Sequence, residues 1–348
     1  MKRKWLWILA WMVFTAGCTS GNVPEEPVET EGSSVMDAVN FHHALDDYEP
    51  EKDTYNFYFT YKLVHPWWDA VAMGLEDAVA QYEAEGVYIT YEYLAPSSVS
   101  AEDQKNRMLD AYERGFDVIG VDVADPEVIG PVIDELMDKG QKVMTFSSSD
   151  AQDSKRIAYV GNTHNYEDGK ELAEVLCEKL QYSGKVGILV GDENVPCHED
   201  RAKGAMDVIA QYPDMTVVSV EYDHDSVENA YDLTKEILEE NPDLAGFVCC
   251  NMSNSVGCGE AVVNAGKKNT VVIVGMDHDL RALKYLRDNV IYCLAVQDCY
   301  SIGFDTIQTA VKIADGESVP ELADERTTLV YREDSEEMIR ILYGESGE

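Results

Sequence analysis

Polar and aromatic side chains at the ends of predicted strands and helices are the groups that could carry out chemistry in this sequence. Two buried strands are expected to end in Ser147 and Asp277, and Trp67 and Trp68 follow a proline at the opening of the first predicted helix. An ionised carboxylate accepts hydrogen bonds from two hydroxyl groups, and an indole face can lie against the C–H face of a sugar ring. Either tryptophan could instead pack in a core, so we expect one to form a ligand wall and the other to be structural.

Motifs of the common enzyme classes are missing from the sequence. It contains no G-x-S-x-G elbow, no P-loop and no G-x-G-x-x-G segment after the first predicted strand. The seven histidines lack metal-binding spacing, and no C-x-x-C pair or Cys/His array predicts zinc. We therefore predict a protein that is not an enzyme and uses no metal or cofactor. An exported α/β enzyme with His65 as general base is the remote alternative.

The charge balance excludes several kinds of partner. The chain of 348 residues has 66 acidic and 27 basic side chains, a formal net charge of −39, and 45% of its residues are hydrophobic. So much negative charge repels nucleic acids and anionic lipid headgroups, whereas the apolar content is enough to bury a core. The length predicts two domains. We expect a small-molecule ligand and no nucleic acid partner.

The amino terminus has the order of an export signal. Basic residues 2–4 precede an apolar run, residues 5–14, that is too short to span a bilayer. The Ala-Gly pair before Cys18 resembles the lipobox of bacterial lipoproteins, in which the cysteine is acylated, although Thr15 stands where leucine is usual. We expect residues 1–17 to be a signal peptide and Cys18 to be lipidated. An ordinary signal sequence with Cys18 as a bystander is the alternative.

The segment after the signal lacks the periodicity of a folded element. Residues 18–54 are rich in Glu, Pro, Gly and Ser, so we expect a flexible acidic tether. The folded part is expected to begin near Tyr55. These features predict an exported protein that is lipid-anchored to the outer face of the cytoplasmic membrane, in the cell envelope or periplasm.

From Tyr55 onwards, short β-rich runs alternate with longer amphipathic stretches. Strands are expected at 55–60, 87–93, 117–123, 142–146, 185–190, 216–221, 246–250, 271–276 and 291–296. Helices are expected at 67–85, 103–114, 126–138, 166–181, 200–211, 227–240, 253–265, 278–288 and 300–315. Strict alternation of strand and helix predicts parallel βαβ units with helices on both faces of the sheet.

A weak internal duplication refines this α/β prediction. Residues 117–147 and 245–277 share one layout, a buried strand, a helix, a glycine and a second buried strand that ends in a polar residue. Two similar doubly wound lobes that face each other would bring those strand ends to a shared crevice, where open parallel sheets bind ligands. The duplication therefore predicts a hinged cleft.

The cysteine count leaves an odd number after Cys18 is set aside. The sequence has 8 cysteines. Those that remain are Cys177, Cys197, Cys249, Cys250, Cys258, Cys293 and Cys299. Several lie in predicted apolar strands or helices, so we favour buried free thiols, with isolated disulfides as the alternative for an exported chain.

Short motifs occur in a characteristic order from Tyr55 to about Arg340. They lie at residues 59–68, 115–121, 160–162, 165–169, 200–204, 251–257, 274–277 and 295–297. In order and spacing they resemble the type 1 periplasmic binding proteins, the ribose- and galactose-binding group of ABC-transporter substrate-binding proteins. The resemblance implies two Rossmann-like lobes joined by a three-strand hinge. Lobe one would comprise residues 55–161 plus 299–326, and lobe two 162–298 plus 327–342.

The resemblance also implies particular binding residues. Asn251, Asp277 and Gln297 match the family's hydroxyl-binding positions, and an amide suits neighbouring hydroxyls because it both donates and accepts. The ligand-binding residues expected from the pattern and the resemblance are Lys62, His65, Trp67, Trp68, Ser147, Ser148, Glu199, Asn251, Asp277 and Gln297.

Some of these positions depart from the family pattern. Ser147-Ser148 stands where sugar binders usually have Asp-Arg, and Glu199 stands where arginine is common. Loss of a charged clamp weakens an assignment to ribose or galactose itself. Lys62 is either a compensating cation or a solvated surface lysine.

The resemblance implies a monomer that captures a sugar or sugar-like polyhydroxylated molecule in the interlobe cleft and delivers it to an ABC permease. The alternative is a sensor protein that presents a sugar or autoinducer-2 to a membrane histidine kinase or chemoreceptor. Autoinducer-2 is an alternative ligand because residues 95–104, with the serines at 147–149, resemble the autoinducer-2 and rhamnose-type branch of the family.

Overall fold

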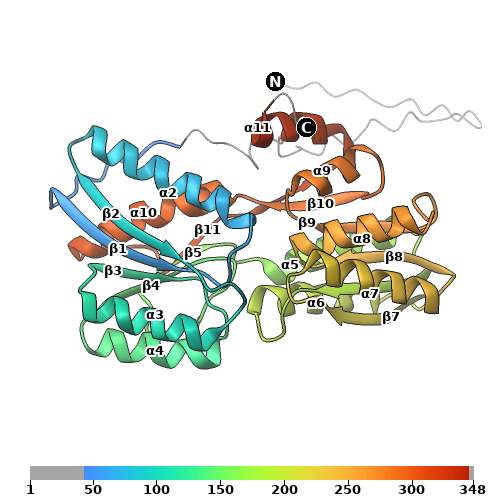
Figure 1. Cartoon of the computed structure of the whole chain (residues 1–348), viewed down its shortest axis with the longest axis horizontal. Helices are drawn as coiled ribbons and strands as arrows, with labels where there is room; N and C mark the ends of the chain where they lie inside the picture. Colours follow the sequence, from blue (N-terminus) through green and yellow to red (C-terminus); the bar gives the residue numbers. More distant parts are fainter. Residues whose placement is uncertain (1–42, 345–348) are drawn as a thin grey trace, which may run out of the picture. The chain divides into compact units, whose positions relative to one another are not determined.

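The computed structural model describes residues 43–344, which form two α/β lobes (Figure 1). Lobe 1 contains β1 (Thr54–Thr60), α2 (Trp67–Ala84), β2 (Tyr88–Leu94), α3 (Ala101–Arg114), β3 (Val118–Val121), α4 (Pro126–Asp138), β4 (Lys142–Ser147), β5 (Tyr159–Gly161), α10 (Cys299–Asp315) and β11 (Leu322–Asp324). Lobe 2 contains α5 (Asn165–Lys179), β6 (Gly184–Val190), α6 (Pro196–Ile209), β7 (Met215–Tyr222), α7 (Val227–Glu240), β8 (Leu244–Cys249), α8 (Met252–Asn264), β9 (Val272–Met276), α9 (Leu280–Arg287), β10 (Cys293–Gln297), β12 (Thr327–Val330), the short 3-10 helix η1 (Arg332–Asp334) and α11 (Ser335–Tyr343).

Each lobe is built on one six-stranded sheet. The strand order is β11-β5-β4-β3-β1-β2 in lobe 1 and β12-β10-β9-β8-β6-β7 in lobe 2. The paired strands run parallel, except that β12 is antiparallel to β10. The predicted α/β class with two parallel-sheet lobes is therefore confirmed.

The chain passes between the two sheets at three places. It leaves lobe 1 after β5, returns after β10, and leaves again after β11 to form β12. The family resemblance predicts lobe boundaries after residues 161, 298 and 326. Only short segments link the lobes, so the segments at the passages can act as a hinge.

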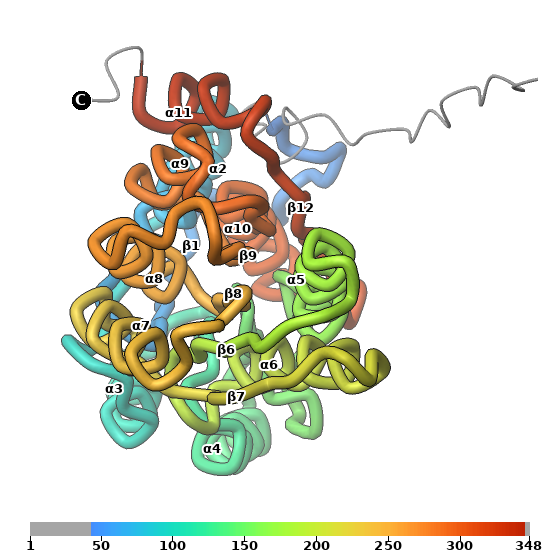
Figure 2. Tube along the Cα trace, turned by 90° about the vertical axis from the view of Figure 1, so that its right-hand side faces the viewer, coloured from blue at the N-terminus to red at the C-terminus, as the bar shows by residue number. Residues whose placement is uncertain are grey.

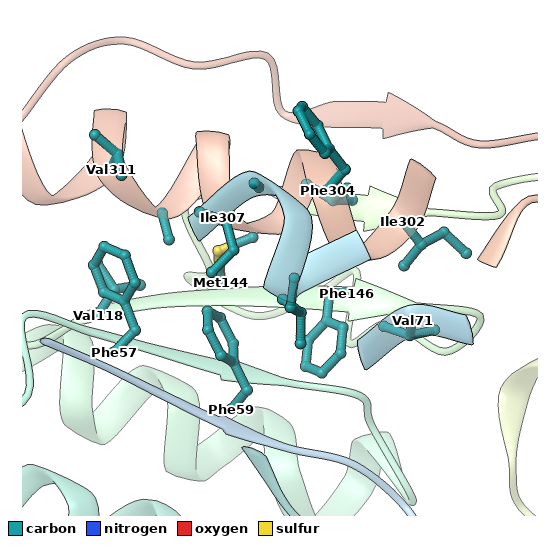
Figure 3. Close-up of a cluster of buried hydrophobic side chains, with 14 of the residues drawn as sticks. Phe57, Phe59, Val71, Val118, Met144, Phe146, Ile302, Phe304, Ile307 and Val311 are labelled. Carbon is teal, nitrogen blue, oxygen red and sulfur yellow. The ribbon is translucent and has the colours of Figure 1, made fainter. Parts of the chain in front are cut away.

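Helices cover both faces of each sheet. In lobe 1, Phe57 and Phe59 point from β1 towards α2 and α10, where they meet Phe146 of β4 and Ile307 of α10 (Figure 3). Tyr58 lies between them in sequence and points to the opposite face, against α3 and α4, as the pleat of a strand requires. In lobe 2, α5 and α6 pack on one face and α7, α8 and α9 on the other (Figure 2). Burial on both faces explains why these strands are almost continuously hydrophobic.

The sequence prediction differs from the structure in several elements. It omitted β5, β11 and β12, which have three or four residues each and so offer too little alternation to detect, and it omitted α11. It also placed the start of α6 at residue 200, whereas the helix begins at Pro196. Proline suits the first position of a helix because its missing N–H has no partner there anyway.

The predicted tether is too long at its carboxyl-terminal end. The His43 ring lies 5.3 Å from the ring of Phe304, and the Asp46 N–H donates to Gln308 Oε1 at 2.9 Å. The Tyr48 hydroxyl donates to Asp315 at 3.0 Å. Residues 43–53 therefore pack on lobe 1, chiefly against α10. The rest of the predicted tether, the signal peptide and Cys18 lie outside the described residues.

Among residues 43–344, no helix combines the length and the apolar composition needed to cross a membrane. The seven cysteines of this part of the chain are all free and buried, as favoured from the sequence.

Two glycines let α2 and α10 approach closely. A Cβ atom added at Gly74 of α2 would lie 2.0 Å from the carbonyl oxygen of Tyr300, and one added at Gly303 of α10 would lie 2.0 Å from that of Val71. These neighbours are backbone atoms and cannot rotate away. The two helices can therefore pack this closely only because both positions are glycine, which has no side chain. By contrast, a Cβ added at Gly130 of α4 would have its nearest neighbour at 4.0 Å.

Replacement of Gly74 by alanine should therefore destabilise the protein, by about 1–3 kcal/mol or more, because the added methyl group forces the helices apart. Gly130→Ala is the matched control and should stabilise by about 0.5–1 kcal/mol through its higher helix propensity. Urea unfolding followed by circular dichroism measures both changes. Equal stability of the two variants would contradict the close helix approach.

Candidate functional site

A cavity lies where the carboxyl ends of strands from both sheets meet. Its volume is about 40 Å³. Lobe 1 supplies Lys62, Leu63, His65, Trp67, Trp68 and Ser148, and lobe 2 supplies His198, Arg201, Asp225, Asn251, Met252, Asp277 and Gln297. Open parallel sheets bind ligands at this edge, so the fold makes the cavity the candidate binding site.

The Asp277 carboxylate joins the two lobes. Its Oδ1 accepts a hydrogen bond from Trp67 Nε1 of lobe 1 at 3.1 Å and one from Gln297 Nε2 of lobe 2 at 2.8 Å. Asp277 follows β9 with a φ of 68°, and Ser147, at the matching end of β4, has a φ of 83°. A left-handed conformation costs a non-glycine residue about 1–3 kcal/mol and is typical of functional sites. Ser147 and Asp277 therefore share a left-handed backbone conformation at the ends of corresponding strands.

Arg201 fixes the orientation of Gln297. Its Nη2 donates to Gln297 Oε1 at 2.9 Å, so the amide nitrogen of Gln297 must face Asp277. The same Nη2 donates to Asn165 Oδ1 at 2.7 Å, and Nη1 donates to the carbonyl oxygen of Cys250 at 3.2 Å. The Nε–H of Arg201 is buried without a hydrogen-bond partner. Arg201 also lines the cavity.

Both predicted tryptophans line the cavity and both are buried. Their rings meet edge to face, with centroids 4.7 Å apart. Trp68 packs into the lobe 1 core, 4.6 Å from the ring of Tyr61, whereas Trp67 reaches across to Asp277. The two rings thus form one wall, with the inner ring holding the outer one in place.

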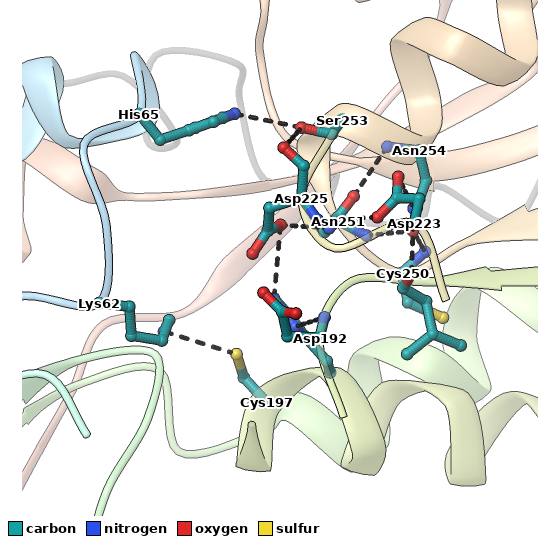
Figure 4. A network of polar contacts seen from close by, with 12 residues as sticks. Lys62, His65, Asp192, Cys197, Asp223, Asp225, Cys250, Asn251, Ser253 and Asn254 are labelled. Atoms are coloured by element: carbon teal, nitrogen blue, oxygen red, sulfur yellow. Dashed lines mark hydrogen bonds and ion pairs between the residues drawn. The ribbon is translucent and has the colours of Figure 1, made fainter. Parts of the chain in front are cut away.

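Lys62 is a buried cation and not a surface lysine. Its Nζ lies 3.0 Å from Asp122 Oδ1 and donates to Ser149 Oγ at 3.1 Å. It also lies 4.0 Å from the sulfur of Cys197, the contact drawn in Figure 4. Burial lowers the pKa of Lys62, but the charges of Asp122, Cys197 and Asp225 together more than offset this and hold the pKa above its usual value. Lys62 therefore stays charged at neutral pH.

His65 makes a second contact between the lobes. Its Nε2 lies 3.2 Å from Ser253 Oγ, and that hydroxyl donates its own hydrogen to the carbonyl oxygen of Asp225 (Figure 4). The hydroxyl must therefore accept from His65, which places the ring proton on Nε2. The backbone N–H of Trp67 donates to His65 Nδ1 at 3.3 Å, in agreement with this tautomer. Burial lowers the pKa of His65, so the ring is neutral.

The far wall of the cavity is acidic. Asp225, in the loop after β7, accepts a hydrogen bond from the side-chain amide of Asn251. Asn251 also caps α8, since its Oδ1 accepts from the Asn254 N–H at 2.7 Å. Both ends of the Asn251 amide are thus engaged within the protein. On this wall of the cavity, the group that can accept hydrogen bonds from a ligand is therefore the carboxylate of Asp225 and not the amide of Asn251.

The structure brings most of the predicted residues together. Those that line the cavity are Lys62, His65, Trp67, Trp68, Ser148, Asn251, Asp277 and Gln297. Glu199 and Ser147 do not line it. Glu199, which was expected from the family resemblance, points to Tyr222 and accepts a hydrogen bond from its hydroxyl at 3.2 Å. The left-handed turn at Ser147 places the next residue, Ser148, at the cavity instead.

Five lining residues were not predicted as ligand contacts. They are Leu63, His198, Arg201, Asp225 and Met252. Asp225 follows a predicted strand, so the rule that ligands bind at the carboxyl ends of strands could have identified it. Arg201 carried no such signal, because its role depends on a long side chain that reaches back from the first turns of α6.

Within residues 43–344, no group of three or more His, Cys, Asp or Glu side chains has the geometry to hold a metal ion.

Comparisons with known proteins agree with this arrangement. A family model described as periplasmic binding protein domain matches residues 57–318. The chain is 28% identical over 210 residues to the D-ribose/D-allose-binding protein of Pseudomonas aeruginosa, covering 59% of this chain and 65% of that protein, slightly less than two thirds. It is 25% identical over 251 residues to the D-allose-binding periplasmic protein of Escherichia coli, covering 69% and 78% of the two chains. The crystal structure of GanP, a glucose-galactose binding protein from Geobacillus stearothermophilus, superposes with a TM-score of 0.74 at 24% identity, over 81% of this chain and 99% of that one.

A buried acid behind the cavity makes stability depend on pH. Asp223 is 0% exposed and accepts from Asn254 Nδ2 at 2.6 Å. Burial and the neighbouring Asp225 charge raise the pKa of Asp223 from 3.8 to about 7, although the Asn254 hydrogen bond opposes them. The folded protein therefore holds a proton that the unfolded chain releases between these pH values. This contribution is fully present below pH 4 and is lost as the pH rises through 7.

We predict that the free energy of unfolding of the wild type falls between pH 5 and pH 8, with about 2–3 kcal/mol of the fall due to Asp223. Asp223→Asn should remove that part of the slope, whatever its effect on absolute stability. Asp214→Asn, which changes an exposed carboxylate, is the control and should leave the slope unchanged. Urea unfolding at both pH values measures this, and identical slopes for Asp223→Asn and wild type would refute the shifted pKa.

Proposed function

Because the chain belongs to the periplasmic binding protein domain family, we propose that it captures a monosaccharide between its two lobes and delivers it to the membrane permease of an ABC transporter. The proteins it is similar to bind sugars and are not enzymes, which supports a binding function without catalysis. Their periplasmic class supports a location outside the cytoplasm.

One observation carries the proposal. The Asp277 carboxylate faces a cavity that is also lined by aromatic rings, by a second carboxylate and by Arg201, whose Nε–H is buried without a partner. Sugar hydroxyls would donate to Asp277 and Asp225, and a sugar oxygen would accept from Arg201 Nε. The Trp67 ring would cover an apolar face of the sugar. Each of these hydrogen bonds gains strength in a cleft from which water is excluded.

Capture requires the lobes to separate and close again. A cavity of about 40 Å³ holds about three water molecules, so a monosaccharide cannot enter while the interlobe contacts of Trp67 and His65 persist. A sugar hydroxyl would take the place of the Trp67 N–H at Asp277. Closure around the sugar would then produce the form that a permease distinguishes from the open one.

The relatives suggest D-ribose and D-allose as the first ligands to test, with autoinducer-2 as the alternative from the sequence. A ligand present at about 100 times its dissociation constant should stabilise the protein by about 2.7 kcal/mol. Asp277→Asn should raise the dissociation constant at least about tenfold, because a charged hydrogen-bond acceptor is worth about 1.5–3 kcal/mol. The amide oxygen can still accept from Trp67 and Gln297, so the melting temperature without sugar should change little.

Glu199→Gln is the matched control and should bind the sugar as the wild type does, since Glu199 faces Tyr222. Thermal shift and calorimetric titration measure both variants. Failure of all three ligands to stabilise the wild type would refute sugar capture, and loss of binding in Glu199→Gln would show that the site is misassigned. Uptake of labelled sugar in cells that lack the gene, restored by the wild type but not by Asp277→Asn, tests delivery to a permease.

We also propose that Cys18 carries the lipid anchor. Cys18→Ser should release the protein from the membrane fraction into the soluble extracytoplasmic fraction, because acylation needs the thiol. Immunoblotting of the separated fractions measures this, with Cys177→Ser as the control for loss of a thiol. A variant that stays in the membrane fraction would show that the anchor is elsewhere.

A further inference from the structure

Cys197 differs from the other cysteines because its sulfur lies at the contact between the lobes. It is the second residue of α6, in lobe 2, and its contacts with Ser148, Ser149 and Lys62 cross to lobe 1. Ser149 Oγ donates to the sulfur at 3.2 Å, Ser148 Oγ at 3.6 Å, and Lys62 Nζ lies at 4.0 Å (Figure 4). Every one of these groups acts as a donor. A sulfur surrounded by donors and an ammonium group, at the amino end of a helix, has the environment of a thiolate.

The charges around Cys197 agree with this geometry. Burial alone would raise its pKa, but Lys62, His198 and Arg201 outweigh burial and hold the pKa well below the usual range. Asp122, from lobe 1, and Asp200, on α6, are the acids that face the same sulfur. Tyr159 and Cys250 also face it and have raised pKa values, so both remain neutral.

Cys250 shows what lobe 2 does to an ordinary buried thiol. It lies after β8 in the core of lobe 2, and burial raises its pKa to about 12. The two cysteines are equally buried and belong to the same lobe. Their difference comes from the charges of Lys62 in lobe 1 and of His198 and Arg201 in lobe 2, which together outweigh burial at Cys197, whereas burial prevails at Cys250.

Access to Cys197 depends on the separation of the lobes. The side chain is 1% exposed, and the atoms that cover the sulfur include the lobe 1 groups Ser148, Ser149 and Lys62. Opening of the cleft removes these partners and exposes the thiolate to solvent. Closing buries it again, so the reactivity of the sulfur follows the position of the lobes.

We propose that Cys197 is a site of reversible covalent modification by small-molecule disulfides, accessible only when the lobes are apart. The thiolate attacks one sulfur of the disulfide, the S–S bond breaks, and a mixed disulfide forms at Cys197. The other half leaves as a thiolate and takes a proton from water. The attached group then occupies the space between Cys197 and Ser149 and prevents closure, which blocks sugar capture. An extracytoplasmic location supplies the oxidising conditions that this exchange needs.

The experiment uses oxidised glutathione and the full chain under native conditions, with peptide mass mapping. We expect one glutathione per chain, on the peptide that contains Cys197, and removal by dithiothreitol. Cys197→Ala should lose the adduct, and Cys250→Ala, the matched control, should keep it. Equal modification of the buried core cysteines, or modification of Cys197 only at urea concentrations that unfold the protein, would overturn the proposal.

A second measurement tests the role of Lys62. Removal of its charge should raise the pKa of the Cys197 thiol in the closed protein, and so shift the midpoint of the pH profile of the reaction upwards by at least about one unit. Lys62→Met would leave Asp122 buried and unpaired, so the variant to use is Lys62→Met with Asp122→Asn. Lys62→Arg should restore the profile. An unchanged profile in the double variant would show that Cys197 is not activated across the lobe contact.

The proposal relies on the lobe motion proposed above but not on the identity of the ligand. If D-ribose or D-allose stabilises the protein, it should also slow glutathionylation of Cys197. The rate should fall in proportion to the fraction of molecules that the sugar holds in the closed form. If a sugar stabilises the protein and Cys197 stays inert, the modification site is refuted and sugar capture stands. If Cys197 reacts with the shifted profile but no sugar binds, sugar capture is refuted and the modification site stands.

Discussion

A carboxylate removed from water must be given hydrogen-bond donors, and the structure around Asp277 is arranged to meet this requirement. One donor, Trp67 Nε1, comes from lobe 1 and the other, Gln297 Nε2, comes from lobe 2. Gln297 can donate only because Arg201 occupies its oxygen. The Trp67 contact between the lobes and the hydrogen bond from Gln297 therefore depend on one acceptor oxygen, Asp277 Oδ1. A sugar hydroxyl can replace the Trp67 N–H because it offers the same kind of donor.

The doubly wound fold explains why such distant residues meet. Each sheet delivers the carboxyl ends of its strands to one edge, and the two edges face each other. The left-handed turns at Ser147 and Asp277 repeat one device at equivalent strand ends. The same edge also brings Lys62 towards Cys197, so a second charged contact forms and breaks with the movement of the lobes. Ligand capture at Asp277 and burial of the Cys197 thiol thus both follow from the way the edges of the two sheets face each other.

Much of this arrangement could be predicted from the sequence, because strong hydrophobic periodicity marks every long strand and helix. Strand ends pointed to Asp277 and Gln297, and the Pro-Trp-Trp sequence pointed to the aromatic wall. Short elements such as β5 were not predicted, because three residues are too few to show a hydrophobic period. Glu199 was expected at the cavity from the family resemblance, but its carboxylate accepts a hydrogen bond from Tyr222 instead. The thiolate environment of Cys197 could not be predicted, because its partners come from positions remote in the chain.

The central claim is that the Asp277 carboxylate passes from a tryptophan donor to a sugar hydroxyl when the protein is loaded. A crystal structure with D-ribose or D-allose tests it most directly. The account predicts sugar hydroxyls about 2.5–3.0 Å from the Asp277 carboxylate, with the ring against Trp67 and with Gln297 still held by Arg201. A sugar bound elsewhere, or an Asp277 that still has Trp67 and Gln297 as its donors while the sugar is bound, would contradict it.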